Sequence, residues 1–177
     1  MSLALKYLPR YNYDDYIGWE GNWELIEGIP YAMSPPPIRK HQRIIYALAN
    51  LVTDSLENCA PCEVLGELDW IIDDNTVVRP DLFIDCEKSD DDFLRNTPVL
   101  IVEVLSPSTA VNDRNLKYEL YEKQGVKYYL IIDPIGEQVE IFELKQKTYK
   151  KQGEFKEGSF DFDLGKCTST INFKEIW

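Results

Sequence analysis

The sequence predicts a mixed α/β (α+β) domain whose central sheet contains both antiparallel and parallel strands. Three observations carry this prediction: an amphipathic helical pattern over residues 38–58, strand-like apolar runs between residues 63 and 105, and a strand–helix–strand succession over residues 99–133. The short return into the last strand implies a right-handed crossover and a parallel strand pair. Because no linker or internal repeat divides the 177 residues, we expect one domain over 1–177, with its core at about 38–134.

Each element has its own signal in the sequence. Residues 23–33 predict two short strands about a Glu27-Gly28 turn, and Ser34-Pro35-Pro36-Pro37 fixes where the next element begins. The helix of residues 38–58 carries apolar side chains at spacings of three and four, namely Ile45, Leu48, Val52 and Leu56. His41 falls on the same stripe.

The strands that follow alternate with turn signals. Residues 63–73 and 76–85 predict an antiparallel hairpin about Asp73-Asp74-Asn75, and residues 99–105 predict a central strand covered on both faces. Asn112 or Asp113 can cap a helix that reaches about Gln124, where Gly125 ends it. Residues 127–133 predict the fourth core strand, and residues 138–177 predict accessory β structure, as do residues 23–33 near the start of the chain.

Two acids stand where the apolar strand pattern does not require them. Asp81 and Glu103 each lie within a predicted strand, and a buried carboxylate is costly unless it is paired, hydrogen-bonded or bound to a metal. Asp81 and Glu103 are therefore the first candidates for functional residues.

Composition restricts the function classes. The net charge of −12 and the pI near 4.5 count against a general electrostatic grip on DNA, although Arg39, Lys40 and Arg43 form one local basic group. A second basic group, in a late hairpin, consists of Lys145, Lys147, Lys150 and Lys151. The absence of a membrane-length apolar run and of a signal-peptide pattern predicts a cytoplasmic protein with no membrane contact.

The four cysteines include one closely spaced pair. Cys59-Ala60-Pro61-Cys62 has the spacing of half a zinc site or of a redox pair, but no second pair follows in the sequence. We expect Cys59, Cys62, Cys86 and Cys167 to be reduced structural thiols, as is usual in the cytosol.

The chain resembles the Uma two family of bacterial restriction endonucleases over nearly its whole length. The resemblance rests on Arg79-Pro80-Asp81, Ile101-Val102-Glu103-Val104-Leu105-Ser106-Pro107-Ser108-Thr109, Asp113, Lys117, Tyr121, Gly125-Val126, Tyr129-Leu130-Ile131-Ile132-Asp133-Pro134, Glu24-Leu25-Ile26-Glu27-Gly28, Ser34-Pro35-Pro36 with His41, and Glu175-Ile176-Trp177. It implies the PD-(D/E)XK restriction-endonuclease-like fold, with its αβββαβ core, and Mg²⁺-dependent hydrolysis of DNA by a homodimer. In such chemistry a hard cation held by one or two carboxylates activates water and relieves charge at the phosphate. We therefore expect Asp81, Glu103 and the backbone carbonyl of Val104 to hold Mg²⁺, for which Mn²⁺ can substitute. No organic cofactor is implied.

The resemblance also implies where the catalytic lysine lies. The usual lysine two residues after the acid is replaced here by Leu105, which makes Lys117, on the following helix, the candidate. Glu27 and His41 are further catalytic candidates, against the plainer interpretations of a turn residue and a core histidine. Without the resemblance, we would expect Lys117 to be a solvated surface residue.

Further side chains and functions stay open. Asp69 could reach the site, and Tyr121 fits packing better than chemistry. The competing function is an inactive nuclease-like scaffold that binds a partner or itself, which the acidic charge and the displaced lysine favour. RNA or a processed DNA end is a weaker alternative substrate, because no base-reading element is recognisable.

Overall fold

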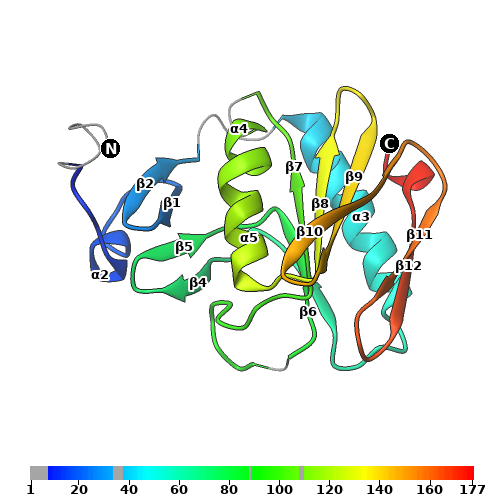
Figure 1. Cartoon of the computed structure of the whole chain (residues 1–177), viewed down its shortest axis with the longest axis horizontal. Helices are drawn as coiled ribbons and strands as arrows, with labels where there is room; N and C mark the ends of the chain where they lie inside the picture. Colours follow the sequence, from blue (N-terminus) through cyan, green and yellow to red (C-terminus); the bar gives the residue numbers. More distant parts are fainter. Residues whose placement is uncertain (1–7, 34–37, 88, 108–109) are drawn as a thin grey trace.

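The computed structural model describes residues 8–33, 38–87, 89–107 and 110–177 (Figure 1). Its centre is a six-stranded sheet in the order β10-β9-β8-β7-β6-β3. The pair β7–β8 is parallel, and the other neighbours are antiparallel, which confirms the predicted mixed sheet and the predicted parallel pair. The strands are β3 (Glu63–Leu65), β6 (Leu82–Asp85), β7 (Leu100–Val104), β8 (Tyr128–Asp133), β9 (Gln138–Lys145) and β10 (Thr148–Phe155).

The long helix α3 (Arg39–Ser55) covers one face of this sheet (Figure 1). Its buried stripe of Ile44, Leu48 and Val52 joins Leu82 and Val102 of the sheet in one apolar core. The hairpin of β11 (Ser159–Asp163) and β12 (Thr168–Asn172) and the 3₁₀ helix η2 (Phe173–Ile176) pack against the same core. The predicted helix and C-terminal β structure are therefore both present.

The opposite face is covered by the second helical segment. It comprises α4 (Ala110–Asn112), the π-helix η1 (Asp113–Lys117) and α5 (Tyr118–Gln124), and it ends at Gly125 with a left-handed φ of 84°, as predicted. Tyr121 and Tyr129 pack edge to face in the core beneath it. The π-helical turn was not predicted, and such turns occur often at functional sites.

The antiparallel pairing predicted for residues 63–73 and 76–85 is confirmed, but each of these two predicted strands is divided between two sheets. β4 (Trp70–Asp73) and β5 (Thr76–Val78) leave the central sheet and form a second one, in the order β2-β1-β5-β4. Its other strands are β1 (Trp23–Ile26) and β2 (Ile29–Ala32), beside the short helix α2 (Tyr13–Tyr16). Pro80 cannot donate to a ladder, which explains why β5 does not run on into β6.

The expectation of reduced thiols is wrong for this structure. Cys59 is joined to Cys167 and Cys62 to Cys86, each in a disulfide. The partners are 108 and 24 residues apart in the chain, so sequence spacing gave no indication of either pair.

Two predicted segments cannot be compared with the structure. The Ser34-Pro35-Pro36-Pro37 breaker and Ser108-Thr109 lie outside the described residues. Over the part of the chain that is described, no helix has the length and apolar character to cross a membrane.

Candidate active site

Asp81 and Glu103 face each other across two neighbouring strands. Leu82 of β6 pairs antiparallel with Val102 of β7, and this register places Asp81, just before β6, opposite Glu103. The backbone N–H of Val104 donates to Oδ2 of Asp81 at 2.8 Å. Gly66 approaches so closely that a Cβ on it would lie 2.5 Å from the Asp81 carbonyl oxygen. The Asp81 side chain is thus bound to β7, and the Asp81 backbone lies against Gly66.

Glu103 is a buried carboxylate that accepts two hydrogen bonds through one oxygen. Lys117 Nζ lies 2.9 Å and the Tyr121 hydroxyl 2.8 Å from its Oε1. Burial raises the pKa of Glu103 well above its ordinary value, and the charge of Lys117 opposes that rise. The sequence predicts only a packing role for Tyr121. In the structure its ring stacks on Trp70, as expected, and its hydroxyl also donates a hydrogen bond to Glu103.

Lys117 is a buried ammonium surrounded by acids. Its Nζ lies 2.8 Å from Glu24 Oε1, 2.9 Å from Glu103 Oε1 and 3.8 Å from Asp113 Oδ1. Burial alone would lower the pKa of Lys117, but the three carboxylates outweigh it and hold the pKa well above its ordinary value. Lys117 therefore stays charged at neutral pH, and it is not the solvated surface residue of the plainer interpretation.

The N-terminal acid at this cluster is Glu24, whereas Glu27 is placed elsewhere. Glu24 is buried in β1, and its Oε1 also accepts from the backbone N–H of Arg79 at 2.9 Å. Glu27 occupies the β1–β2 turn with φ of 50°, its side chain is 70% exposed, and it lies 3.5 Å from Lys123. Glu27 and Lys123 line a separate cavity of about 360 Å³. The signal for Glu24 was present in the sequence, since it is an acid within the apolar strand that β1 forms.

His41 reaches the acids from the first turn of α3. Its Nε2 lies 3.1 Å from Oδ2 of Asp81, and the ring is buried. Burial lowers the pKa of His41, yet the hydrogen bond and charge of Asp81 outweigh it, so that the net pKa is raised. Among the described residues, none lies within hydrogen-bonding distance of its Nδ1. His41 is thus both a buried residue and a neighbour of Asp81.

Asp69 is held in a different set of contacts. Its Oδ1 accepts from Arg79 Nε at 2.7 Å, and its Oδ2 accepts from the Tyr16 hydroxyl at 3.0 Å. The structure thus brings together Asp81, Glu103, Val104, Lys117 and His41 among the predicted residues. It adds Glu24 and Asp113 to the cluster.

The cluster has the chemistry of a site for a hard cation and an anionic substrate. Several carboxylates converge on one buried ammonium, and an imidazole lies at the edge. Carboxylate and carbonyl oxygens are the ligands that Mg²⁺ prefers, and a positioned lysine can stabilise negative charge that develops on a phosphate.

Comparisons with known proteins identify the family and the fold of the chain. An uncharacterised protein of Synechocystis sp. (strain ATCC 27184 / PCC 6803 / Kazusa) is 28% identical over 144 residues, which are 76% of this chain and 74% of that protein. A solved structure, described as "a putative nuclease belonging to DUF820" from Anabaena variabilis ATCC 29413, superposes with a TM-score of 0.73 at 16% identity. The match covers 92% of this chain and 95% of that one, and it shows that the two share a fold. The family model Uma2, described as "Putative restriction endonuclease", matches residues 12–160, and the chain therefore belongs to the Uma2 family.

Proposed function

We propose that this protein is a Mg²⁺-dependent endonuclease that hydrolyses DNA phosphodiester bonds at the Asp81–Glu103 cluster. The observation that carries the proposal is the register of β6 and β7, which sets the two carboxylates opposite each other with Lys117 Nζ 2.9 Å from Glu103. Membership of a family described as restriction endonucleases supports the same reaction class.

The donor set fits Mg²⁺. Lys117 and Tyr121 both use Oε1 of Glu103, and Val104 N–H and His41 both use Oδ2 of Asp81. We assign Oε2 of Glu103, Oδ1 of Asp81 and the Val104 carbonyl to the ion. When bound, Mg²⁺ would activate a water and offset charge on the phosphate.

The chain's own residues divide the remaining work. Lys117 is cationic at neutral pH, so it acts as a fixed positive charge beside the phosphate and not as a proton acceptor. Glu24 and Asp113 keep its ammonium on the Glu103 side of the cluster. His41 holds Oδ2 of Asp81 through its Nε2 and so positions this carboxylate for the ion.

The test combines metal binding with cleavage on the same samples. Mg²⁺ and Mn²⁺ are titrated calorimetrically into the wild type, Asp81→Asn and Glu103→Gln, and supercoiled plasmid and a structured RNA are offered to each. We expect the wild type to bind the metal and nick the plasmid, and each variant to lose both activities while it unfolds cooperatively. Cleavage that persists in both variants would refute the site, and cleavage of RNA alone would refute the substrate.

A second candidate function is an inactive nuclease-fold scaffold. The observation that favours it is the enclosure of Lys117 by three carboxylates, which compensates this charge without a substrate. This candidate predicts that the wild type binds neither Mg²⁺ nor DNA.

We also propose that the active form is a homodimer, because cutting both DNA strands commonly takes two copies of such a site. Light scattering at several protein concentrations tests this point. A strictly monomeric protein that still makes double-strand breaks would contradict it.

A further inference from the structure

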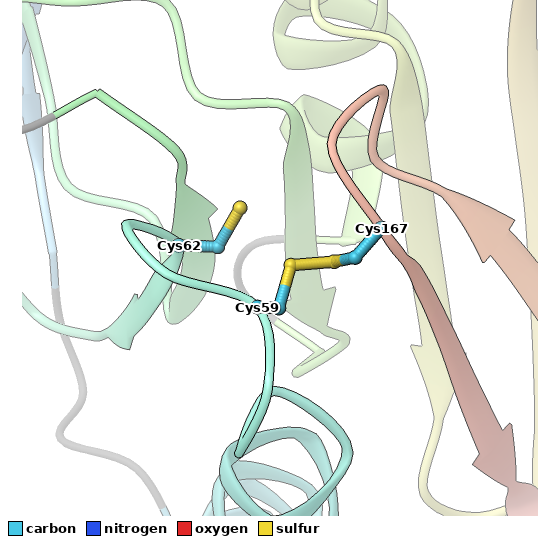
Figure 2. Close-up of side chains that lie close together, drawn as sticks. All are labelled: Cys59, Cys62 and Cys167. Atoms are coloured by element: carbon cyan, nitrogen blue, oxygen red, sulfur yellow. A yellow bond between two sulfur atoms is a disulfide. The ribbon is translucent and has the colours of Figure 1, made fainter.

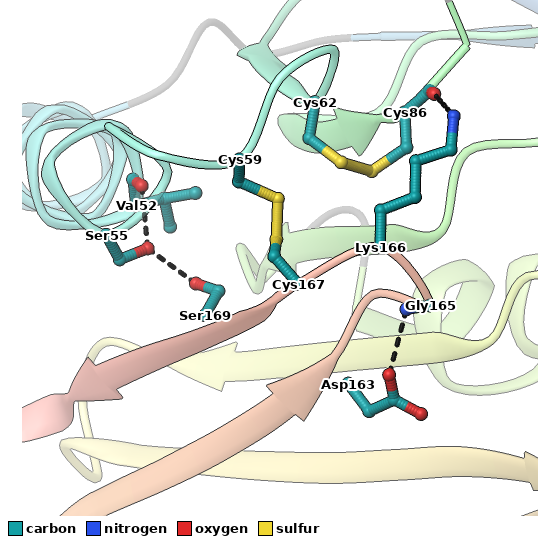
Figure 3. Close-up of a disulfide and its surroundings, with 10 residues drawn as sticks. All are labelled: Val52, Ser55, Cys59, Cys62, Cys86, Asp163, Gly165, Lys166, Cys167 and Ser169. Atoms are coloured by element: carbon teal, nitrogen blue, oxygen red, sulfur yellow. Dashed lines mark hydrogen bonds between the residues drawn. A yellow bond between two sulfur atoms is a disulfide. The ribbon is translucent and has the colours of Figure 1, made fainter.

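All four cysteines of the chain gather at one place, away from the acidic cluster. Cys59 and Cys62 lie in the turn after α3, Cys86 follows the end of β6, and Cys167 lies in the loop of the β11–β12 hairpin (Figure 3). The residue types are unlike those of the acidic cluster, since thiolates bind soft or borderline metals and Mg²⁺ prefers oxygen.

The two disulfides lie next to each other, with three of the four sulfurs in one close group and the fourth bonded to a member of that group. The Sγ atoms of Cys59, Cys62 and Cys167 all lie within 4.8 Å of one another (Figure 2). The fourth sulfur, that of Cys86, is bonded to Cys62. Two independent disulfides have no need to be adjacent, whereas a tetrahedral zinc site with Zn–S bonds of about 2.3 Å needs four sulfurs about 3.8 Å apart.

The backbone explains why these residues meet. The strand pairing of Glu63 with Asp85 places Cys62 across from Cys86 at the end of the β3–β6 pair. The turn after α3 closes with a hydrogen bond from Cys62 N–H to the Cys59 carbonyl at 2.7 Å, which keeps these two cysteines together. A bond from Leu164 N–H to the Cys167 carbonyl at 2.9 Å closes the hairpin loop that brings in Cys167.

We propose that Cys59, Cys62, Cys86 and Cys167 together form a tetrathiolate Zn²⁺ site. The Cys59-x-x-Cys62 spacing supplies half of it, and the fold supplies the half that is missing from the sequence pattern. Cys59 and Cys86 are buried, and Lys166 Nζ lies 2.8 Å from the Cys86 carbonyl, a cation suited to the net negative charge of four thiolates on one Zn²⁺. The ion would tie α3, the β3–β6 edge and the C-terminal hairpin to one point.

The disulfides and the zinc site use the same four sulfurs in two redox states. With a phosphine as reductant, each disulfide takes up two electrons and two protons to give two thiols. The phosphine becomes its oxide with the oxygen of a water molecule. Binding of Zn²⁺ to the four thiols then releases their protons, with no further change of oxidation state.

The experiment begins with the full-length wild type, reduced with the phosphine. Thiol titration under denaturing conditions should count the four cysteines. The reduced protein is then equilibrated with Zn²⁺ or Co²⁺ alone, desalted and analysed for metal. We expect about one equivalent of either ion and, with Co²⁺, the near-ultraviolet thiolate charge-transfer absorption that oxygen ligands do not give.

Variants test whether the sulfurs are the ligands. Cys86→Ser and Cys167→Ser each remove one sulfur from a different chain segment, and we expect affinity for Co²⁺ to fall by more than the roughly 10–100-fold typical of outer-shell changes. Ser169→Ala is the matched control. Ser169 lies in β12 of the same hairpin as Cys167, its hydroxyl contacts Ser55 Oγ of α3 at 2.5 Å, and all four sulfurs remain.

The outcomes decide the proposal in either direction. Stoichiometric metal with thiolate absorption, lost in the two cysteine variants and kept in Ser169→Ala, supports it. Fully reduced, folded wild type that takes up neither ion overturns it, as does unchanged Co²⁺ affinity in Cys167→Ser. Excess Mg²⁺ should not displace the Co²⁺, which separates this site from the acidic cluster.

Discussion

Lys117 Nζ lies 2.8 Å from Glu24 Oε1, and this buried ion pair joins the π-helix η1 to strand β1 of the four-stranded sheet. The same ammonium lies 2.9 Å from Glu103 Oε1 on the central sheet. The charge of Lys117 therefore connects the four-stranded and six-stranded sheets at the proposed active site. Its removal would leave the carboxylates of Glu24, Glu103 and Asp113 close together without a cation.

Lys117→Met should destabilise the fold by about 3–5 kcal/mol, because loss of one partner leaves buried charge uncompensated. Urea unfolding followed by circular dichroism measures this. Adding Glu103→Gln to Lys117→Met should restore part of the loss, since one unpaired carboxylate is gone. Lys123→Met, at a side chain that is 69% exposed, is the control and should change stability little. Equal losses at Lys117 and Lys123 would contradict the role of the cluster.

Glu24→Gln should weaken Mg²⁺ binding and plasmid nicking by about 10–100-fold, the usual effect of removing a partner that orients a ligand group. Glu24 touches Lys117 and is a positioning residue in this proposal. Glu27→Gln removes an acid of the same type three residues later in an exposed turn, and should behave as the wild type. Calorimetry and nicking on both variants make the comparison. A stronger effect at Glu27 would return the role to the residue chosen from the sequence.

Gly66→Ala should perturb Asp81 without touching its side chain. The added Cβ would meet the Asp81 carbonyl oxygen at 2.5 Å, so the backbone must shift, at a cost of about 1–3 kcal/mol. We expect lower stability and weaker Mg²⁺ binding together. Gly18→Ala is the control, because its Cβ would make only an ordinary 3.4 Å contact. Wild-type metal affinity in Gly66→Ala would show that the Asp81 backbone tolerates the displacement.

The ion pairs of Glu140 should give the fold an acid-dependent contribution. Burial raises the pKa of Glu140, but Arg114 and Lys151, which both contact it, outweigh burial and lower the pKa below its ordinary 4.5. A lowered folded-state pKa means that this stabilisation is present above about pH 4.5 and is lost as the pH falls through the folded-state value. For a pair this accessible we expect roughly 0.2–1 kcal/mol.

Unfolding curves of the wild type and Glu140→Gln between neutral and acidic pH measure that contribution. The difference in stability should shrink as the pH falls. Glu154→Gln, which removes another acid beside Lys151, leaves both Glu140 pairs in place and should have less effect on the curve. A difference that grows toward acid would contradict the assigned direction of the pKa shift.

The sequence predicted the features that follow from local pattern. The α3 helix, the β7 strand, the end of the second helix at Gly125 and the parallel β7–β8 pair are all present. Asp81 and Glu103 were identified from the sequence because a carboxylate in an apolar strand is costly unless it is paired, hydrogen-bonded or bound to a metal. The same reasoning applied to β1 would have identified Glu24.

What the sequence did not predict depends on contacts between distant segments. The π-helical turn at Asp113–Lys117 has no compositional signal, and it lies where Lys117 meets acids from two sheets. The division of the long hairpin between two sheets depends on how the chain packs on either side of Arg79-Pro80. The alternation of apolar and polar residues along a strand carries no information about that packing. Cys86 and Cys167 carry no spacing motif, so only the folded chain shows that they join Cys59 and Cys62.

The outer edge of the central sheet bears on how two copies of this chain could associate. β10 is the last strand of that sheet, Lys150 and Lys151 are exposed along it, and its register with β9 shifts between Lys151 and Gly153. Lysines and an irregular register on an edge strand discourage another strand from adding there. A twofold assembly of this protein should therefore leave β10 bordered by water, and its contact surface should be sought on a different side of the molecule.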